Sequence, residues 1–167
     1  MNLVTLDQVD LKTLARLADA FVREPIAFPV CFAVTGTLGA GKTRWTQELA
    51  RAMGLDSSEV TSPTFTLLRT YQAKQHTLHH VDAYRVGDED EWWELGLEEC
   101  YQEPNAWTVI EWADRFADAM PPEAIWMQID IQADSPASGT REIQFRCADP
   151  ERWRWVERVL GQLRPGR

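Results

Sequence analysis

A short glycine-containing run has the residue types and spacing needed to bind phosphate. The stretch from Gly36 to Thr43 reads GxxxxGK[ST], the pattern of a P-loop. Glycines permit sharp turns with positive φ, so successive backbone N–H groups can converge on one phosphate. Lys42 would reach the outer phosphates, and the Thr43 hydroxyl would bind Mg²⁺. The alternative is a tight glycine turn with no ligand.

The residues on either side of this run indicate the strand and the helix that a P-loop requires. Residues 28–34 form a nearly continuous apolar run, as expected for a strand covered on both faces of a parallel sheet. After the loop, Trp45 and Leu49 share one side of a helix that ends at Gly54. The N-terminus of that helix, near Lys42, would add a favourable field for an anion.

Two acidic residues could face the same phosphates. Asp82 lies near the end of an apolar strand over residues 77–84, and Glu111 ends another strand that begins at Trp107. The carboxyl ends of parallel strands gather at the sheet edge from which the loop emerges. A carboxylate there can hold Mg²⁺ or orient attacking water. Alternatively, Asp82 caps a turn and Glu111 caps the helical stretch that follows it.

The middle of the chain predicts an antiparallel hairpin. Residues 62–71, which start with SPTFT, form a β-rich stretch, and a turn near residues 73–75 leads to the strand over residues 77–84. Neighbouring strand residues point to opposite faces, so His79 and His80 diverge. The three histidines therefore cannot converge on one metal ion, and we expect them at the surface or in hydrogen bonds.

The remaining patterns predict scaffold elements. Residues 10–23 have helical apolar spacing behind a capping aspartate. Residues 125–132 and 141–147 alternate like two strands joined by the polar turn 133–140. Asp149, followed by proline, is placed to cap a last helix that packs through an apolar stripe.

The segment from Gly87 to Tyr101 is rich in acids and predicts a short acidic helix with a partly apolar face. A solvated face explains the pattern. A docking surface made by two exposed tryptophans, Trp92 and Trp93, is the alternative, because aromatic residues are enriched at interface anchors.

The composition indicates one acidic domain. At 167 residues, the chain 1–167 is expected to form a single domain around one core. The net charge is −9 without a Lys/Arg cluster, which disfavours extended direct binding to nucleic acid. No targeting signal or membrane-spanning run is found, so we expect an unprocessed cytoplasmic chain. An odd number of cysteines without CxxC spacing suits buried thiols in a reducing compartment: Cys31, Cys100 and Cys147.

Four motifs in this order resemble the TsaE family of ATPases, which serve the biosynthesis of threonylcarbamoyladenosine in bacterial tRNA. They are LGAGKT at 38–43, SPTF at 62–65, HVDAYR at 80–85 and VIEW at 109–112. The resemblance implies an α/β P-loop nucleoside triphosphate hydrolase fold, with a small mixed, mostly parallel sheet flanked by helices. It also implies ATP and Mg²⁺ as ligands, and ATPase activity that is weak alone and stimulated by partners. The implied partners are TsaB and TsaD, which attach the threonylcarbamoyl group beside the anticodon, so tRNA is met only through the complex.

Carried over by position, the resemblance also implies site residues. Lys42, Asp82 and Glu111 would be catalytic, and Thr43 and Glu111 would hold Mg²⁺. Thr64, with Thr66, resembles a switch that senses the terminal phosphate. Arg141 matches an arginine that contacts ATP, although an ordinary exposed arginine has the same spacing. The complete set of implied nucleotide contacts is Thr37, Leu38, Gly39, Ala40, Gly41, Lys42, Thr43, Thr64, Trp112 and Arg141.

Thr37 departs from the family pattern, which usually has aspartate directly after the first glycine of the loop. Hydrolysis could therefore be weaker or differently triggered here. Two other functions stay open. A small-molecule kinase would need an acceptor pocket and arginines over the phosphates, which the sequence does not indicate, and a non-catalytic sensor would use the nucleotide to change partner affinity. A GTPase is disfavoured because no [NT]KxD motif follows the loop.

Overall fold

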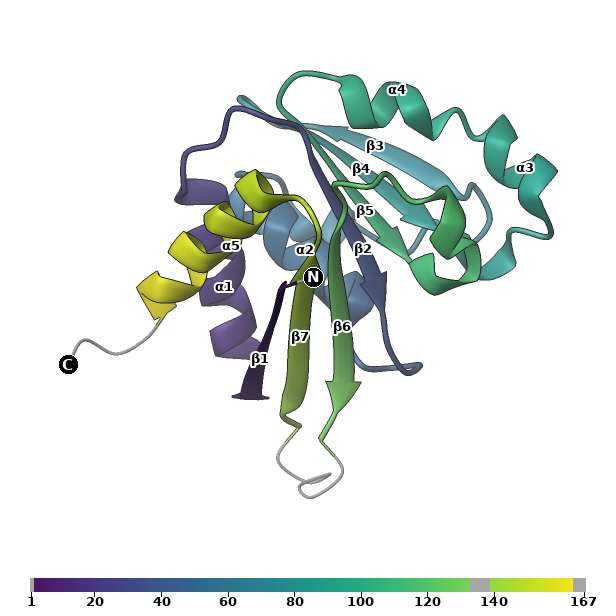
Figure 1. The fold of residues 1–167 in the computed structure, drawn as a ribbon. Helices are drawn as coiled ribbons and strands as arrows, with labels where there is room; N and C mark the ends of the chain where they lie inside the picture. Colours follow the sequence, from purple (N-terminus) through teal and green to yellow (C-terminus); the bar gives the residue numbers. More distant parts are fainter. Residues whose placement is uncertain (1, 133–138, 164–167) are drawn as a thin grey trace.

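The computed structural model describes residues 2–132 and 139–163, and a seven-stranded mixed sheet runs through it (Figure 1). The strands are Asn2–Val9 (β1), Val30–Thr35 (β2), Leu68–Gln72 (β3), Thr77–Asp82 (β4), Ala106–Glu111 (β5), Ile125–Ile131 (β6) and Arg141–Cys147 (β7). Their spatial order is β1-β7-β6-β2-β5-β4-β3. All run in one direction except β3 and β7, which confirms the predicted mixed, mostly parallel sheet.

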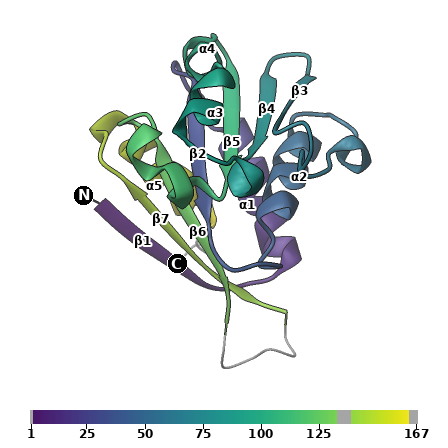
Figure 2. The same ribbon diagram turned by 90° about the vertical axis from the view of Figure 1, so that its right-hand side faces the viewer.

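Helices cover both faces of this sheet (Figures 1 and 2). One face carries α1 (Leu11–Arg23), α2 (Lys42–Ala52) and α5 (Pro150–Leu163), and the other carries α3 (Glu89–Glu94) and α4 (Leu97–Gln102). Alternate residues of β2 enter the two apolar clusters, Phe32 on the first face and Ala33 on the second. Because both faces are covered, every residue of β2 is buried, as its apolar run predicts.

A cluster of buried aromatic rings holds the first face together. Phe21 of α1 lies 5.3 Å from Phe32 of β2 and 5.0 Å from Trp155 of α5, between ring centroids. Trp45 of α2 lies 5.5 Å from Phe32. Since β2 and α2 flank the glycine loop, this packing fixes both ends of the loop.

Several local predictions are confirmed. The Asp10 carboxylate accepts a hydrogen bond from the Thr13 backbone N–H at 2.7 Å, and Asp149 accepts one from the Arg152 N–H at 2.8 Å, so both aspartates cap their helices. β3 and β4 pair as the expected antiparallel hairpin, and β6 and β7 pair in the same manner. The polar turn predicted between β6 and β7 falls largely outside the described residues.

The N-terminal strand was not predicted. β1 pairs with β7 at the edge of the sheet, and its side chains are mostly exposed or half-buried. Its register shifts near Gln8, which has φ +54°. An edge strand with a solvent-exposed face has weak alternation of apolar and polar residues, and the partner of β1 lies far along the chain. The local sequence pattern therefore gives little indication of a strand here.

The acidic segment also differs from its prediction. It forms two short helices, α3 and α4, because Gly96 between them has φ +64° and ends the first. The interpretation with two exposed tryptophans is wrong: Trp92 is 2% exposed and stacks on Phe116 at 4.8 Å, whereas Trp93 is 52% exposed. The SPTFT residues are not part of a strand either, since β3 begins only at Leu68.

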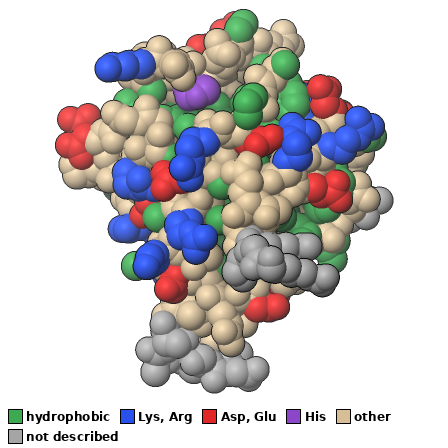
Figure 3. All heavy atoms as spheres, turned by 90° about the vertical axis from the view of Figure 1, so that its left-hand side faces the viewer, with side chains coloured by type: hydrophobic (Ala, Val, Ile, Leu, Met, Phe, Trp, Pro, Cys, Tyr) green, Lys and Arg blue, Asp and Glu red, His purple; other side chains and the backbone are tan. Residues whose placement is uncertain are grey.

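The face of the molecule seen from the left-hand side of Figure 1 carries interspersed basic and acidic side chains (Figure 3). Arg158 of α5 pairs with Glu24 at 2.6 Å, and Arg51 of α2 pairs with Asp19 of α1 at 2.8 Å. Both arginine side chains are exposed, and ion pairs at the surface contribute little to stability. The aromatic cluster, rather than these ion pairs, therefore holds the helices against the sheet.

We predict that Gly36→Ala lowers the free energy of unfolding by about 3 kcal/mol or more. Gly36 has φ +128°, and an added Cβ would lie 1.9 Å from the Ile129 carbonyl oxygen of β6. Gly54→Ala is the matched control, because its φ is +84° but no atom lies within 4 Å of the added carbon. The control should lose only about 1 kcal/mol. Equal losses in urea denaturation would contradict the steric explanation.

Candidate functional site

The loop between β2 and α2 has the backbone that a phosphate cradle needs. Gly36, Gly39 and Gly41 have φ values of +128°, +79° and +112°, a region that other residues rarely adopt. The Ala40 N–H donates to the Thr37 carbonyl at 3.2 Å, which closes a turn inside the loop. The predicted strand–loop–helix unit is confirmed, and the helix N-terminus directly follows the loop.

Lys42 is folded into the curve of this loop. Its Nζ donates to the carbonyl oxygens of Gly36 and Thr37, both at 2.8 Å, and lies 3.6 Å from the centroid of the Trp112 ring. Burial lowers the pKa of the amino group, and nearby carboxylates, with Glu111 the strongest, partly oppose that shift. Two carbonyl oxygens and one aromatic ring therefore fix the position of the Lys42 side chain beside the loop.

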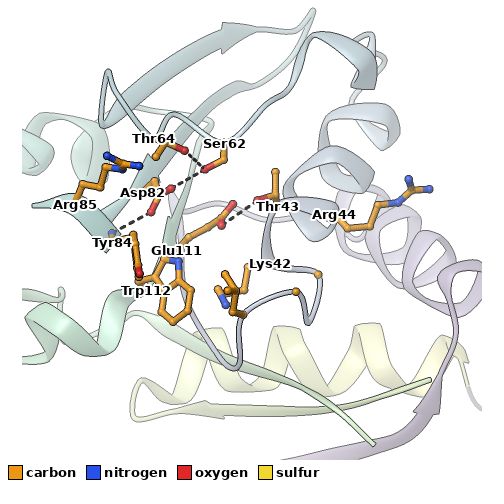
Figure 4. A pocket seen from close by; sticks show the side chains of 13 residues that line it. Lys42, Thr43, Arg44, Ser62, Thr64, Asp82, Tyr84, Arg85, Glu111 and Trp112 are labelled. Atoms are coloured by element: carbon orange, nitrogen blue, oxygen red, sulfur yellow. Dashed lines mark hydrogen bonds between the residues drawn. The ribbon is translucent and has the colours of Figure 1, made fainter. Parts of the chain in front are cut away.

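Glu111 joins the loop helix to the sheet. The Thr43 hydroxyl donates to Glu111 Oε2 at 3.0 Å (Figure 4), and His80 Nε2 lies 2.7 Å from Oε1. Glu111 is only 3% exposed. A hydroxyl and a carboxylate on adjacent elements provide hard oxygen ligands, which Mg²⁺ prefers. Mg²⁺ usually binds only one or two such protein ligands, together with water and phosphate oxygens. The pair fits the expected Mg²⁺ site.

Asp82 lies directly across from Glu111 in the register of the parallel strands β4 and β5. Its Oδ1 accepts from the Tyr84 backbone N–H at 3.0 Å, so it caps the turn that follows β4, as one of the two interpretations predicted. Its Oδ2 accepts from the Ser62 hydroxyl at 2.6 Å, and Ser62 Oγ lies 3.2 Å from Thr64 Oγ1. Asp82 therefore links the sheet edge to the SPTF segment while it also lines the cavity.

These groups surround one cavity of about 440 Å³ at the mouth of the loop (Figure 4). Its walls include most of the residues that the sequence singled out. The lining residues are Leu38, Gly39, Gly41, Lys42, Thr43, Arg44, Ser62, Thr64, Asp82, Tyr84, Arg85, Glu111 and Trp112.

Three expected nucleotide contacts are not part of the cavity wall: Thr37 and Ala40, which belong to the loop, and Arg141, which lies beside it. Arg141 Nε donates to the Ala40 carbonyl at 2.8 Å, and a Cβ added to Gly41 would lie 3.2 Å from the same nitrogen. Arg141 thus contacts the loop backbone at Ala40 and Gly41. The backbone N–H of Thr37 donates to Asp130 Oδ1 at 3.2 Å, so an acid from β6 adjoins the position at which the family usually has aspartate.

Sequence reasoning missed several residues of the cavity wall. Tyr84 and Arg85 belong to the HVDAYR motif, but the motif by itself indicates no role for them; both line the cavity, and the Arg85 guanidinium lies 5.1 Å from the centroid of the Phe65 ring. Arg44 follows the loop directly and pairs with Glu48 at 2.8 Å. Ser62 was recognisable only as the first letter of SPTF, because its contact with Asp82 depends on tertiary structure.

Trp112 adopts an uncommon backbone conformation at this site. Its φ of +59° and ψ of +35° place a bulky residue in the left-handed region, which costs free energy unless the surroundings fix it. The ring contacts Tyr84, with centroids 5.1 Å apart, and covers Lys42. The strained turn therefore places an aromatic wall over the lysine.

Other predicted features can be placed as well. The three cysteines are free and buried, as expected. Within the described residues, no cluster of three or more His, Cys, Asp or Glu side chains is arranged to hold a metal ion, and His79 and His80 diverge into separate hydrogen bonds. None of the helices in the described ranges has the length and apolar character needed to cross a membrane.

Comparisons of the sequence with known proteins all point to one family, and a comparison of structures supports the fold. A family model described as "Threonylcarbamoyl adenosine biosynthesis protein TsaE" matches residues 8–143. A TsaE protein from Treponema pallidum is 38% identical over 108 residues, covering 65% of this chain and 75% of the relative. One from Bacillus subtilis is 33% identical over 141 residues, covering 84% and 82%. The crystal structure of Bacillus subtilis YdiB has the same fold, with a TM-score of 0.72 and 24% identity over 96% of each chain.

We predict that Thr43→Val lowers the free energy of unfolding by about 1.5 kcal/mol, measured without nucleotide. Valine keeps the shape of threonine but removes the donor to Glu111 Oε2, and hydrogen bonds to charged groups are worth about this much. Thr43→Ser keeps the hydroxyl and should stay close to the wild-type value. Equal stability of the valine and serine variants would contradict the assigned contact.

Proposed function

The chain belongs to the TsaE family of threonylcarbamoyl adenosine biosynthesis proteins, and from this premise we propose that it is the Mg²⁺-dependent ATPase of the bacterial machinery that makes this tRNA modification. The observation that carries the proposal is the convergence of Lys42, Thr43, Asp82 and Glu111 on one cavity at the mouth of a P-loop. TsaB and TsaD are the proposed partners. Contact with tRNA is proposed only through the complex.

Phosphate binding is assigned to the loop and to Lys42. The backbone N–H groups of residues 39–43 would surround the β-phosphate, at the positive end of α2. A lysine ammonium has three donors, and the carbonyls of Gly36 and Thr37 take two of them. The remaining donor is available to an outer phosphate oxygen, so the lysine need not leave its place to bind the nucleotide.

Thr43 and Glu111 would hold the magnesium ion, and both residues line the cavity. The ion, when bound, neutralises charge on the β- and γ-phosphate oxygens. Trp112 would lie against the nucleotide while it keeps Lys42 in place. Arg141 would act through the loop backbone, since it donates to the Ala40 carbonyl at 2.8 Å.

Asp82 would orient the attacking water and accept its proton. Each carboxylate oxygen has two acceptor positions, and the known contacts use one on each oxygen, from Ser62 and from the Tyr84 N–H. The free positions could receive a water placed in line with the terminal phosphate. The water oxygen would bond to phosphorus as the bond to ADP breaks.

The proposed activity is weak until partners bind. A hydrolase whose own site lacks one group that stabilises the transition state hydrolyses slowly. In GTPases, one arginine supplied by a partner raises the rate about 10³- to 10⁵-fold. Thr37 stands where the family usually has aspartate, and its backbone is bound to Asp130 instead. This arrangement supports hydrolysis that depends on a group supplied by the complex.

A nucleotide sensor is the second candidate function. It is favoured by the hydrogen bonds that join Thr64 to Ser62 and Ser62 to Asp82, because they couple the SPTF segment to the site. In a sensor, loss of the terminal phosphate contact would change partner affinity, and hydrolysis would be incidental. Only the ATPase needs Asp82 for turnover.

We predict that Asp82→Asn lowers the rate of ATP hydrolysis about 100-fold or more, the usual range for loss of a general base. ADP affinity should stay within about threefold, because Asp82 is not assigned to bind the nucleotide. The measurements are phosphate release and calorimetric ADP titration. Asp88→Asn, which alters a helix cap outside the cavity, is the matched control. Unchanged hydrolysis in Asp82→Asn would favour the sensor.

A further inference from the structure

His80 is a fully buried residue that the proposed mechanism does not use. It lies on β4, in register with Val109 of β5, and has 0% exposure. Side chains two residues apart on a strand share a face, so Glu111 projects to the same side as Val109. His80 Nε2 reaches diagonally to Glu111 Oε1 at 2.7 Å.

The chemistry of the pair defines the donor. An ionised carboxylate only accepts hydrogen bonds, so the proton of the contact is on His80 Nε2. His80 Nδ1 is buried and has no hydrogen-bond partner among the described residues. A proton there would be a buried donor without an acceptor, which is costly. Both facts place the proton of this contact on Nε2, so His80 is the donor and Glu111 the acceptor.

Glu111 is consequently held at both oxygens. Thr43 donates to Oε2 from the loop helix, and His80 donates to Oε1 from the neighbouring strand. Two donors on opposite oxygens fix the rotation of the carboxylate group. Partners of this kind orient metal ligands, and their loss typically reduces metal affinity about 10- to 100-fold.

The adjacent histidine provides an internal comparison. His79 is also buried, at 5% exposure, and its Nε2 also lies near a carboxylate, Glu103 Oε2, at 2.9 Å. It points to the opposite side of the same strand, where its Nδ1 contacts the Thr70 hydroxyl at 2.9 Å. The two histidines thus share strand, burial and type of partner, but only His80 contacts the residue assigned to the metal.

We propose that His80 is a positioning residue that holds the Glu111 carboxylate in the orientation needed by the divalent cation. The inference rests on the proposed function, because it takes Glu111 as a Mg²⁺ ligand. His80 acts through Glu111 and touches neither nucleotide nor reacting water. It should therefore govern the Mg²⁺ requirement for nucleotide binding, and not only the rate of hydrolysis.

The test titrates MgCl₂ at a fixed concentration of fluorescent N-methylanthraniloyl-ADP with the full chain, so no hydrolysis is needed. His80→Asn carries an amide too short to reach Glu111, whereas His80→Gln places its amide near the position of Nε2. We expect His80→Asn to raise the half-saturating Mg²⁺ concentration about 10- to 100-fold. His80→Gln should restore it to within about threefold of wild type, and affinity without Mg²⁺ should be unchanged in both.

His79→Asn is the matched control and should leave the Mg²⁺ requirement within about twofold of wild type. Circular dichroism and urea midpoints check the fold of each variant, and His80→Leu replaces His80→Asn if the latter does not fold. An unchanged Mg²⁺ requirement in His80→Asn (or in His80→Leu, where that variant replaces it), or an equal shift in His79→Asn, overturns the inference.

Glu111→Ala separates this inference from the proposed function. If wild type shows no Mg²⁺-dependent binding, or Glu111→Ala leaves it intact, the assigned metal site fails and the role of His80 falls with it. If Glu111→Ala raises the Mg²⁺ requirement but His80→Asn does not, only the role of His80 is overturned.

Discussion

The buried carboxylate of Glu111 is the constraint on which the site depends. A charged group that is 3% exposed must be matched by donors, since an unpaired buried charge is strongly destabilising. The donors come from α2 through Thr43 and from β4 through His80. Satisfying one carboxylate therefore fixes the loop helix and two neighbouring strands relative to each other, and it does so at the mouth of the cavity.

Uncommon backbone conformations also occur at this place. The loop glycines have positive φ, and Trp112 adopts the left-handed conformation directly after Glu111. Glycine adopts positive φ readily, whereas a bulky residue such as Trp112 keeps this conformation only where surrounding packing determines it. Here the buried strand β2 and the aromatic cluster around Phe32 supply that packing. The buried core next to the site thus supports it, and the site contacts the less regular SPTF segment through the hydrogen bond between Ser62 and Asp82.

The parts of the fold and of the site that could be predicted are those with local physical requirements. The glycine pattern, the doubly buried strand and the capping aspartates Asp10 and Asp149 depend on nearby residues alone. The burial of Trp92 depends on Phe116, and the place of Arg141 depends on the Ala40 carbonyl, far along the chain. No local pattern encodes such contacts. The alternation of β4 separated His79 from His80, but their carboxylate partners required the neighbouring elements.

The central claim is ATP hydrolysis that serves a tRNA-modifying complex, and the most direct test is phosphate release from Mg-ATP by the purified protein, alone and with TsaB, TsaD and tRNA. Lys42→Ala provides the blank. The account predicts a small rate above this blank that rises strongly when the partners are added. A rate that the partners do not change, or phosphate recovered on a small-molecule acceptor, would contradict it and favour a kinase with the same fold.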